Sequence, residues 1–210
     1  MLLFYNGTIH TMTGKPADVV VVDDKGLIVY AGDFAHMPTY TQIRRVDLDG
    51  RTLIPGFNDA HVHIWKLGLL LTIQVDARSN AAPTIPAIIV GFAERAAKLP
   101  PGTWITGRGY NEAQLPERRH LTRYDLDQAS PHHPMALTRT CGHMIVANSL
   151  ALQLAGIDRD TPNPPGGVIV HDEHGEPTGL VQETAMGLIA RVMPDIDDEI
   201  MGRGIREAMY

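Results

Sequence analysis

The sequence contains a single cysteine, Cys141, among its 210 residues. One cysteine cannot form an internal disulfide, which favours a reducing compartment, and we therefore expect a cytoplasmic protein. No His/Asn partner pattern accompanies Cys141, so we expect a small buried side chain rather than a nucleophile. The N-terminus has neither the positively charged stretch nor the long apolar stretch of a signal peptide, so none is expected.

Long apolar runs and basic clusters are missing as well. The longest apolar run, around Leu67 to Leu71, is far shorter than the roughly 20 residues of a membrane span. The net charge is −6, and the only Lys/Arg doublets are Arg44-Arg45 and Arg118-Arg119. A nucleic-acid surface needs clustered cations to neutralise phosphates. We therefore predict neither a nucleic-acid nor a membrane partner, but a small-molecule substrate; assembly into a homo-oligomer stays open.

The composition fits a folded protein, with 44% hydrophobic and 20% charged residues. Residues 1–53 have the pattern of short strands separated by turns, with apolar or β-branched runs at 2–5, 17–22 and 27–32. Asn6-Gly7 and Asp23-Asp24-Lys25-Gly26 are strong turn signals. We predict a β-rich half-sandwich over residues 1–53, without a helix of three or more turns.

Residues 54–210 are expected to form a second domain, in which strands and helices alternate. Apolar residues at helical spacing predict a helix over 83–99, with Pro86 in its first turn. The other elements expected are strands at 104–110 and 135–139, a short helix near 124–129, helices at 147–155 and 183–192, a hairpin joining 168–170 to 178–181, and a helical tail from 195. This alternation predicts an α/β fold.

The most informative segment is Pro55-Gly56-Phe57-Asn58-Asp59-Ala60-His61-Val62-His63. We predict that His61 and His63 lie at the end of a strand, where residues two apart point to the same face, so both imidazoles can reach one ion. Imidazole is a common ligand of zinc and similar divalent metals. Asp59 lies on the same face and can approach the metal or orient a ligand. The alternative is a pair of half-exposed strand histidines without a metal.

This segment resembles the first-strand motif of the amidohydrolase superfamily, Pro-Gly-Phe-x-Asp-x-His-x-His. Two later strings, Gly142 to Leu152 and Asp160 to Glu183, resemble one branch, amidohydrolase family 3, which includes N-substituted formamide deformylase. The resemblance implies that His61 and His63 bind a divalent metal, with zinc expected. It also implies the first part of a TIM-like barrel, and hydrolysis of non-peptide carbon–nitrogen bonds through a metal-activated water.

The length departs from this family. A whole barrel takes about 250 residues, so the chain is expected to be truncated, with the general base beyond residue 210. The alternative function is a non-catalytic fragment that binds metal weakly or needs a complementary chain. His143 is a candidate metal ligand or pocket residue, or a plain loop histidine. Glu183 is a candidate metal ligand or pocket residue, or a glutamate in the first turn of a helix, where the dipole favours it.

Overall fold

The structure is a computed structural model that describes residues 1–209. Its contacts divide the chain into two compact units, Met1–Val62 and His63–Tyr210, and each is described by itself. The sequence placed the boundary earlier, after residue 53, and the intervening residues 54–62 belong to no strand or helix. The assignment of 1–53 and 54–210 as domains stays a prediction.

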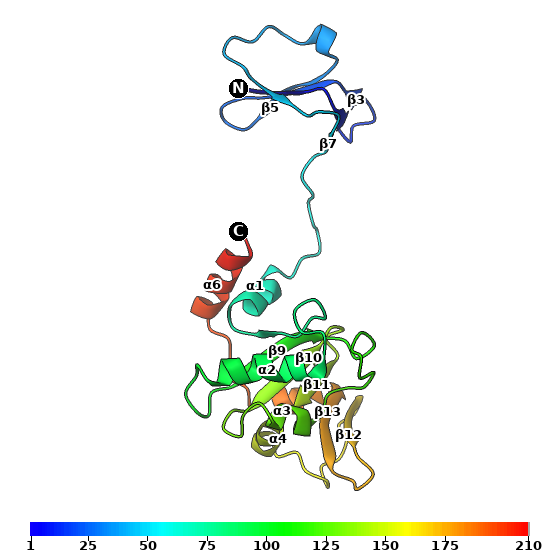
Figure 1. Cartoon of the computed structure of the whole chain (residues 1–210), viewed down its shortest axis with the longest axis vertical. Coiled ribbons are helices and arrows are strands. Elements are labelled where there is room, and N and C mark those ends of the chain that lie inside the picture. The colour runs from blue at the N-terminus through cyan, green and yellow to red at the C-terminus, as the bar shows by residue number, and fades with distance from the viewer. Residues whose placement is uncertain (210) are drawn as a thin grey trace. The chain divides into compact units, whose positions relative to one another are not determined.

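The first unit is built from short strands, which confirms the expected β-rich character of residues 1–53 (Figure 1). The strands are β1 (Leu2–Tyr5), β2 (Thr8–His10), β3 (Pro16–Ala17), β4 (Val19–Val22), β5 (Ile28–Gly32), β6 (Arg44–Asp47) and β7 (Thr52–Leu53). They form a four-stranded sheet in the order β5-β4-β1-β6 and a three-stranded sheet in the order β3-β2-β7. The one helical segment among them is a single 3₁₀ turn, Phe34–His36.

Strand β4 organises the core of this unit. Val19 and Val21 pack with Leu3 in one buried cluster, while Val20 packs with Ile9 in another. Successive side chains of a strand point to opposite faces, so a run of valines can bury both faces of the sheet. The β-branched sequence Val19–Val22 therefore suits a strand with a core on either side.

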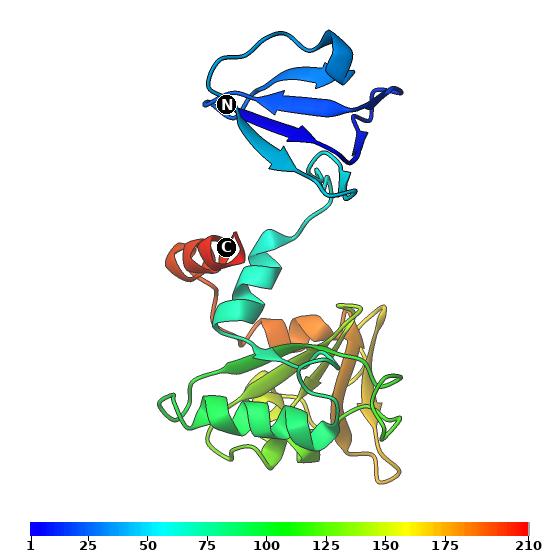
Figure 2. The same cartoon turned by 45° about the horizontal axis from the view of Figure 1, so that its top comes forward.

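The second unit contains a six-stranded mixed sheet and six helices among its described residues (Figure 2). The strands are β8 (Val75–Asp76), β9 (Ile105–Tyr110), β10 (Met135–Arg139), β11 (Met144–Ala147), β12 (Gly167–His171) and β13 (Pro177–Glu183). The helices are α1 (Ile64–Thr72), α2 (Ile85–Ala96), α3 (Arg123–Asp127), α4 (Ser149–Ala155), α5 (Met186–Ala190) and α6 (Asp198–Ala208).

The sheet order is β12-β13-β11-β10-β9-β8. Strands β8, β9 and β10 are parallel, whereas β10, β11, β13 and β12 pair antiparallel. The α/β class is therefore confirmed. The described residues of this unit contribute three parallel strands, and the expectation that they begin a TIM-like barrel stays a prediction.

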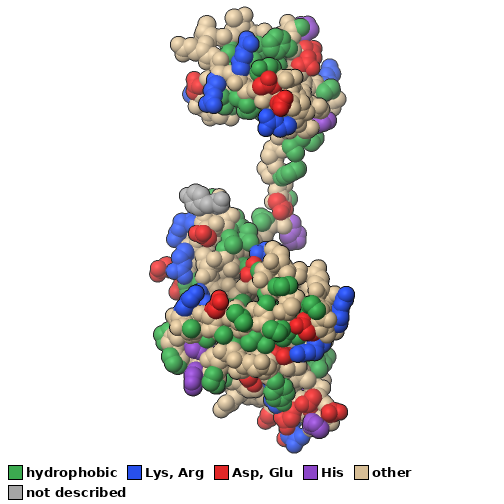
Figure 3. All heavy atoms as spheres, viewed as in Figure 1, with side chains coloured by type: hydrophobic (Ala, Val, Ile, Leu, Met, Phe, Trp, Pro, Cys, Tyr) green, Lys and Arg blue, Asp and Glu red, His purple; other side chains and the backbone are tan. Residues whose placement is uncertain are grey.

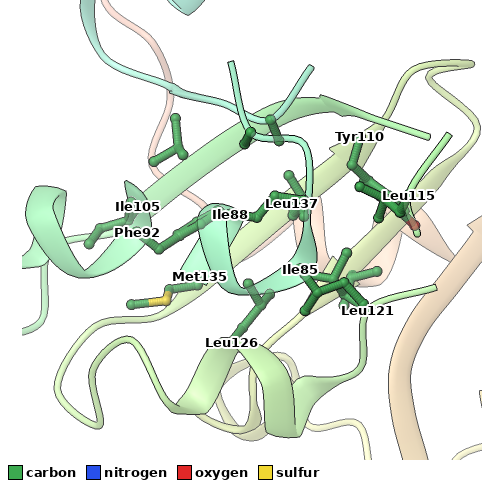
Figure 4. Packing of buried hydrophobic residues seen from close by; sticks show 14 of the residues in the cluster. Ile85, Ile88, Phe92, Ile105, Tyr110, Leu115, Leu121, Leu126, Met135 and Leu137 are labelled. Carbon is green, nitrogen blue, oxygen red and sulfur yellow. The ribbon is translucent and has the colours of Figure 1, made fainter. Parts of the chain in front are cut away.

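Each face of this sheet has its own core. On one face, Phe92 and Ile88 of α2 pack with Ile105 and Leu137 (Figure 4). Gly107 makes room there, because a Cβ on it would lie 2.7 Å from the Phe92 ring. A separate buried cluster includes residues of β10, β11 and β13 together with α4 and α5. The helix predicted at 83–99 is α2, and its Thr84 N-cap accepts a hydrogen bond from the Ala87 N–H at 3.2 Å.

Helix α1 was not expected from the sequence, where residues 67–71 were noted only as an apolar run. It packs against α6. The two backbones approach most closely at Gly68 and Gly204, where a Cβ on Gly204 would lie 2.9 Å from the Gly68 carbonyl carbon. Glycine at both positions therefore allows the crossing. No helix within residues 1–209 is long and apolar enough to cross a membrane.

Candidate functional site

The segment that carries His61 and His63 is not a strand, so the prediction that the two histidines lie at the end of a strand is wrong. Strand β7 ends at Leu53, and α1 begins at Ile64. The physical reason lies in the same segment: Pro55 has no N–H to donate to a ladder, and Gly56 has no side chain to pack. The argument that strand geometry places both rings on one face therefore fails. The metal-ligand role of the two histidines stays a prediction.

Local hydrogen bonds determine how this segment turns into α1. The Asp59 carboxylate accepts the backbone N–H of His61 at 2.9 Å. His63 is the N-cap residue of α1, and its carbonyl accepts the N–H of Lys66 at 2.9 Å. The boundary between the two units falls between Val62 and His63, so His61 belongs to the first unit and His63 to the second. Asp59 therefore shapes the backbone at His61, and its role beside a metal stays a prediction.

A second group of polar side chains lies where the parallel strands end. Asp76, the last residue of β8, accepts hydrogen bonds from the Arg78 guanidinium, the shortest at 2.6 Å. Arg139, the last residue of β10, donates two hydrogen bonds of 2.7 Å to Glu112, just after β9. Ligand sites of α/β folds lie at the carboxyl ends of their strands. This edge is therefore the natural place for chemistry in the second unit.

The Glu112–Arg139 pair is the strongest electrostatic feature of this edge. The paired hydrogen bonds from Arg139 lower the pKa of Glu112 to about 2. Tyr110 lies beside it, and burial raises the pKa of its phenol. The Tyr110 hydroxyl is 3.1 Å from Nδ1 of His120. Two-point contact between a guanidinium and a carboxylate fixes their relative orientation, so this pair ties the ends of β9 and β10 together.

His143 and Glu183, forty residues apart in sequence, meet at this end of the sheet. His143 follows the turn after β10, and its Nδ1 lies 3.1 Å from a Glu183 carboxylate oxygen. The backbone N–H of Glu183 also donates to the His143 carbonyl at 3.0 Å. Both side chains are exposed, at 66% and 56%, so they can reach a ligand.

The backbone of Glu183 corrects one sequence interpretation. Glu183 is the last residue of β13, and α5 begins only at Met186. It is therefore not in the first turn of a helix. Its φ of 52° lies in the left-handed region that side chains rarely adopt. Residues held in this region cluster at functional sites, which favours the pocket interpretation of Glu183.

Cys141 is exposed, so the expectation of a buried thiol is wrong. It lies in the turn between β10 and β11, and its sulfur accepts the His143 N–H at 3.4 Å. Partial burial raises the pKa of this thiol, but hydrogen bonds from His143 and Arg139 outweigh that effect and leave the pKa below its usual range.

The charged residues of this edge that were not predicted as site residues include Arg108, Glu112 and Arg139. Their position in the sequence could have identified them, because each lies in the last part of, or just after, a strand that the sequence did predict. What the sequence could not supply was the order of the strands, which brings Glu112 against Arg139.

The site residues fit a divalent metal in kind but not in number. Imidazole and carboxylate groups are ordinary zinc ligands, and a catalytic zinc usually takes three of them from the protein. In the part of the chain that the structure describes, no three His, Cys, Asp or Glu side chains are placed to hold one ion. A metal centre built on His61 and His63 therefore needs a third ligand, which residues 1–209 do not place beside them.

A hollow in the first unit has a volume of about 760 Å³ and lies beside its two sheets. Its lining is mostly apolar and includes Ile9, Val20, Ile28 and Leu53. None of the predicted site residues lines it. In the second unit, the face drawn in Figure 3 carries acidic and basic side chains in mixed order, without a large basic patch.

Comparison with known proteins agrees with the motif. Residues 44–209 match the family model described as the amidohydrolase family. The chain is 35% identical to a Bacillus subtilis protein provisionally named as an amidohydrolase, YtcJ, over 99% of this chain and 39% of that protein. It is 31% identical to N-substituted formamide deformylase of Arthrobacter pascens, over 90% of this chain and 35% of that enzyme. The chain thus spans about two fifths of the relatives' length.

A solved structure is similar over nearly the whole chain. It is an uncharacterised metal-dependent hydrolase from Pyrococcus horikoshii, 27% identical, with a TM-score of 0.55, covering 99% of this chain and 39% of that one. The family match includes the His61-Val62-His63 string and both branch-specific strings. On these matches, the chain belongs to the amidohydrolase family.

Proposed function

We propose that this chain is part of a metal-dependent hydrolase that acts on non-peptide carbon–nitrogen bonds of small molecules. His61 and His63 would supply two ligands of a divalent ion, zinc in our proposal. The observation that carries the proposal is the family match over residues 44–209, which includes the His-x-His string. The single cysteine supports a reducing, cytoplasmic setting.

The chemistry divides between the ion and the chain. A bound divalent ion lowers the pKa of a water toward neutrality and polarises the substrate carbonyl. The chain's own contribution begins with the imidazoles of His61 and His63, and with Asp59, which holds the backbone at His61. His143 and Glu183 offer an imidazole nitrogen and a carboxylate oxygen to a substrate at the strand ends. No residue of this chain is assigned as the general base.

The first test is metal binding by the purified chain. We expect zinc to bind after reconstitution, as measured by elemental analysis, and His61→Ala and His63→Ala each to weaken it by tenfold or more. His174→Ala is the matched control, because His174 lies exposed at the β12–β13 turn. Equal zinc content in all four proteins would remove the two histidines as ligands.

The second candidate function is a non-catalytic fragment that binds metal weakly and needs a complementary chain. Its support is the missing third ligand among residues 1–209 and the 39% coverage of the relatives. We expect the zinc-loaded chain to hydrolyse N-formyl and N-acyl amines far more slowly than full-length N-substituted formamide deformylase. Turnover that matches that enzyme and disappears in His61→Ala would exclude this candidate.

A further inference from the structure

Three arginines lie at the carboxyl edge of the parallel strands, and two of them are neutralised. Arg78 pairs with Asp76 at 2.6 Å, and Arg139 pairs with Glu112 at 2.7 Å. Arg108 of β9 lies between them in the sheet, opposite Asp76 on β8 and Thr138 on β10. Within residues 1–209, its guanidinium has no hydrogen bond or ion pair.

The direction of the Arg108 side chain follows from the pleat. Gly107 faces Phe92 of α2, so Arg108, the next residue, points to the opposite face of the sheet. Its terminal Nη2 lies 3.8 Å from the position that a Cβ on Gly142 would occupy. Gly142 directly precedes His143. The guanidinium therefore lies against the turn that carries the His143–Glu183 pair.

We propose that Arg108 binds a carboxylate of the substrate, so that the site accepts anionic amides such as N-acyl or N-formyl amino acids. This deepens the hydrolase proposed above and rests on it. A guanidinium presents a planar fork of N–H donors that matches a carboxylate in two-point contact. Arg108 is half-buried, and partial burial strengthens such a contact relative to an open surface.

The neighbouring charges do not oppose an incoming anion. The carboxylates of Asp76, Glu112 and Glu183 each already face a cationic or N–H group of their own. The positive charge of Arg108 is the one left uncompensated at this edge. Glycine at 142 also leaves open the space beside the guanidinium, since any side chain there would occupy it.

The test is a binding measurement that does not depend on turnover. Ligand-observed NMR titrations of the 210-residue chain, at fixed ionic strength and with chelator present, would compare N-acetylglycine with its neutral isostere N-acetylglycinamide. We expect the anion to bind about tenfold more tightly. Arg108→Met should abolish this preference, and Arg108→Lys, which keeps the charge but loses the fork, should retain only part of it.

Arg191→Met is the control, because it removes the same charge from an exposed position after α5 and should leave the preference intact. Far-UV circular dichroism and melting curves would establish that each variant is folded; if Arg108→Met does not fold, Arg108→Lys decides. No preference in the native chain, or an undiminished preference in the folded Arg108 variants, would overturn the proposal. Zinc binding is measured separately. Failure of the hydrolase proposal would therefore appear in the zinc measurement and not in the carboxylate titration.

Discussion

Replacing Glu112 by Gln should destabilise the second unit by an amount that depends on pH. The carboxylate accepts two hydrogen bonds from Arg139, both of 2.7 Å, and the two side chains are only 22% and 20% exposed. A pKa lowered from 4.5 to about 2 corresponds to about 3 kcal/mol of stabilisation. Solvent screening reduces this figure, and we expect about 2 kcal/mol at pH 7.

The direction of the pH dependence follows from linkage. The folded-state pKa of Glu112 lies below its unfolded value of 4.5, so the unfolded chain binds the extra proton first. The contribution is complete above about pH 4.5 and disappears as the pH falls through the folded-state value near 2. Native protein and Glu112→Gln should therefore differ at pH 7 and converge in acid.

Urea unfolding at a series of pH values would measure this difference. Arg139→Met and the double variant complete a double-mutant cycle, in which the interaction free energy isolates the pair from the loss of either side chain alone. The native protein and Glu112→Gln are compared by their free energies of unfolding. If the difference between them stays constant from pH 7 to pH 3, the reasoning is refuted, because the lost stability then comes from packing and not from charge.

Two further substitutions test how the second unit is held together. Gly68→Ala should lower the free energy of unfolding, measured in urea, by about 1–3 kcal/mol, because the new methyl group would meet the backbone of Gly204. Gly187→Ala is the control: Gly187 lies in α5 with open space around it, so this change should leave the free energy of unfolding unaltered. Equal effects of the two substitutions would contradict a tight crossing of α1 and α6. Asn148→Ala should lower the free energy of unfolding by about 2–3 kcal/mol, because the buried amide of Asn148 caps α4 and hydrogen-bonds the backbone at the start of β10. Asp197→Ala removes an exposed N-cap and should lower it by about 1 kcal/mol. A larger loss for Asp197→Ala than for Asn148→Ala would contradict the role of burial.

Local pattern was sufficient for most elements of the fold. The strand at Met135–Arg139 has the predicted bounds, and the predicted helix over 83–99 is observed as Ile85–Ala96. In both, the deciding information lies within a few residues: a short apolar run in the first and a 3.6-residue apolar period with an N-cap in the second. The strand end predicted at His61 and His63 fails because a strand also needs a partner, and the ladder between β2 and β7 ends at Leu53.

The sequence by itself determined the family and the residues that carry its motif, because a string such as Pro55 to His63 is a local property of the chain. The tertiary structure alone decided which distant residues meet. Strand order brings His143 to Glu183 across forty positions and Glu112 to Arg139 across 27. Among residues 1–209, it leaves Arg108 without a counter-ion between two neutralised arginines. Such contacts depend on the packing of the whole sheet, because no local period or propensity specifies which strands become neighbours.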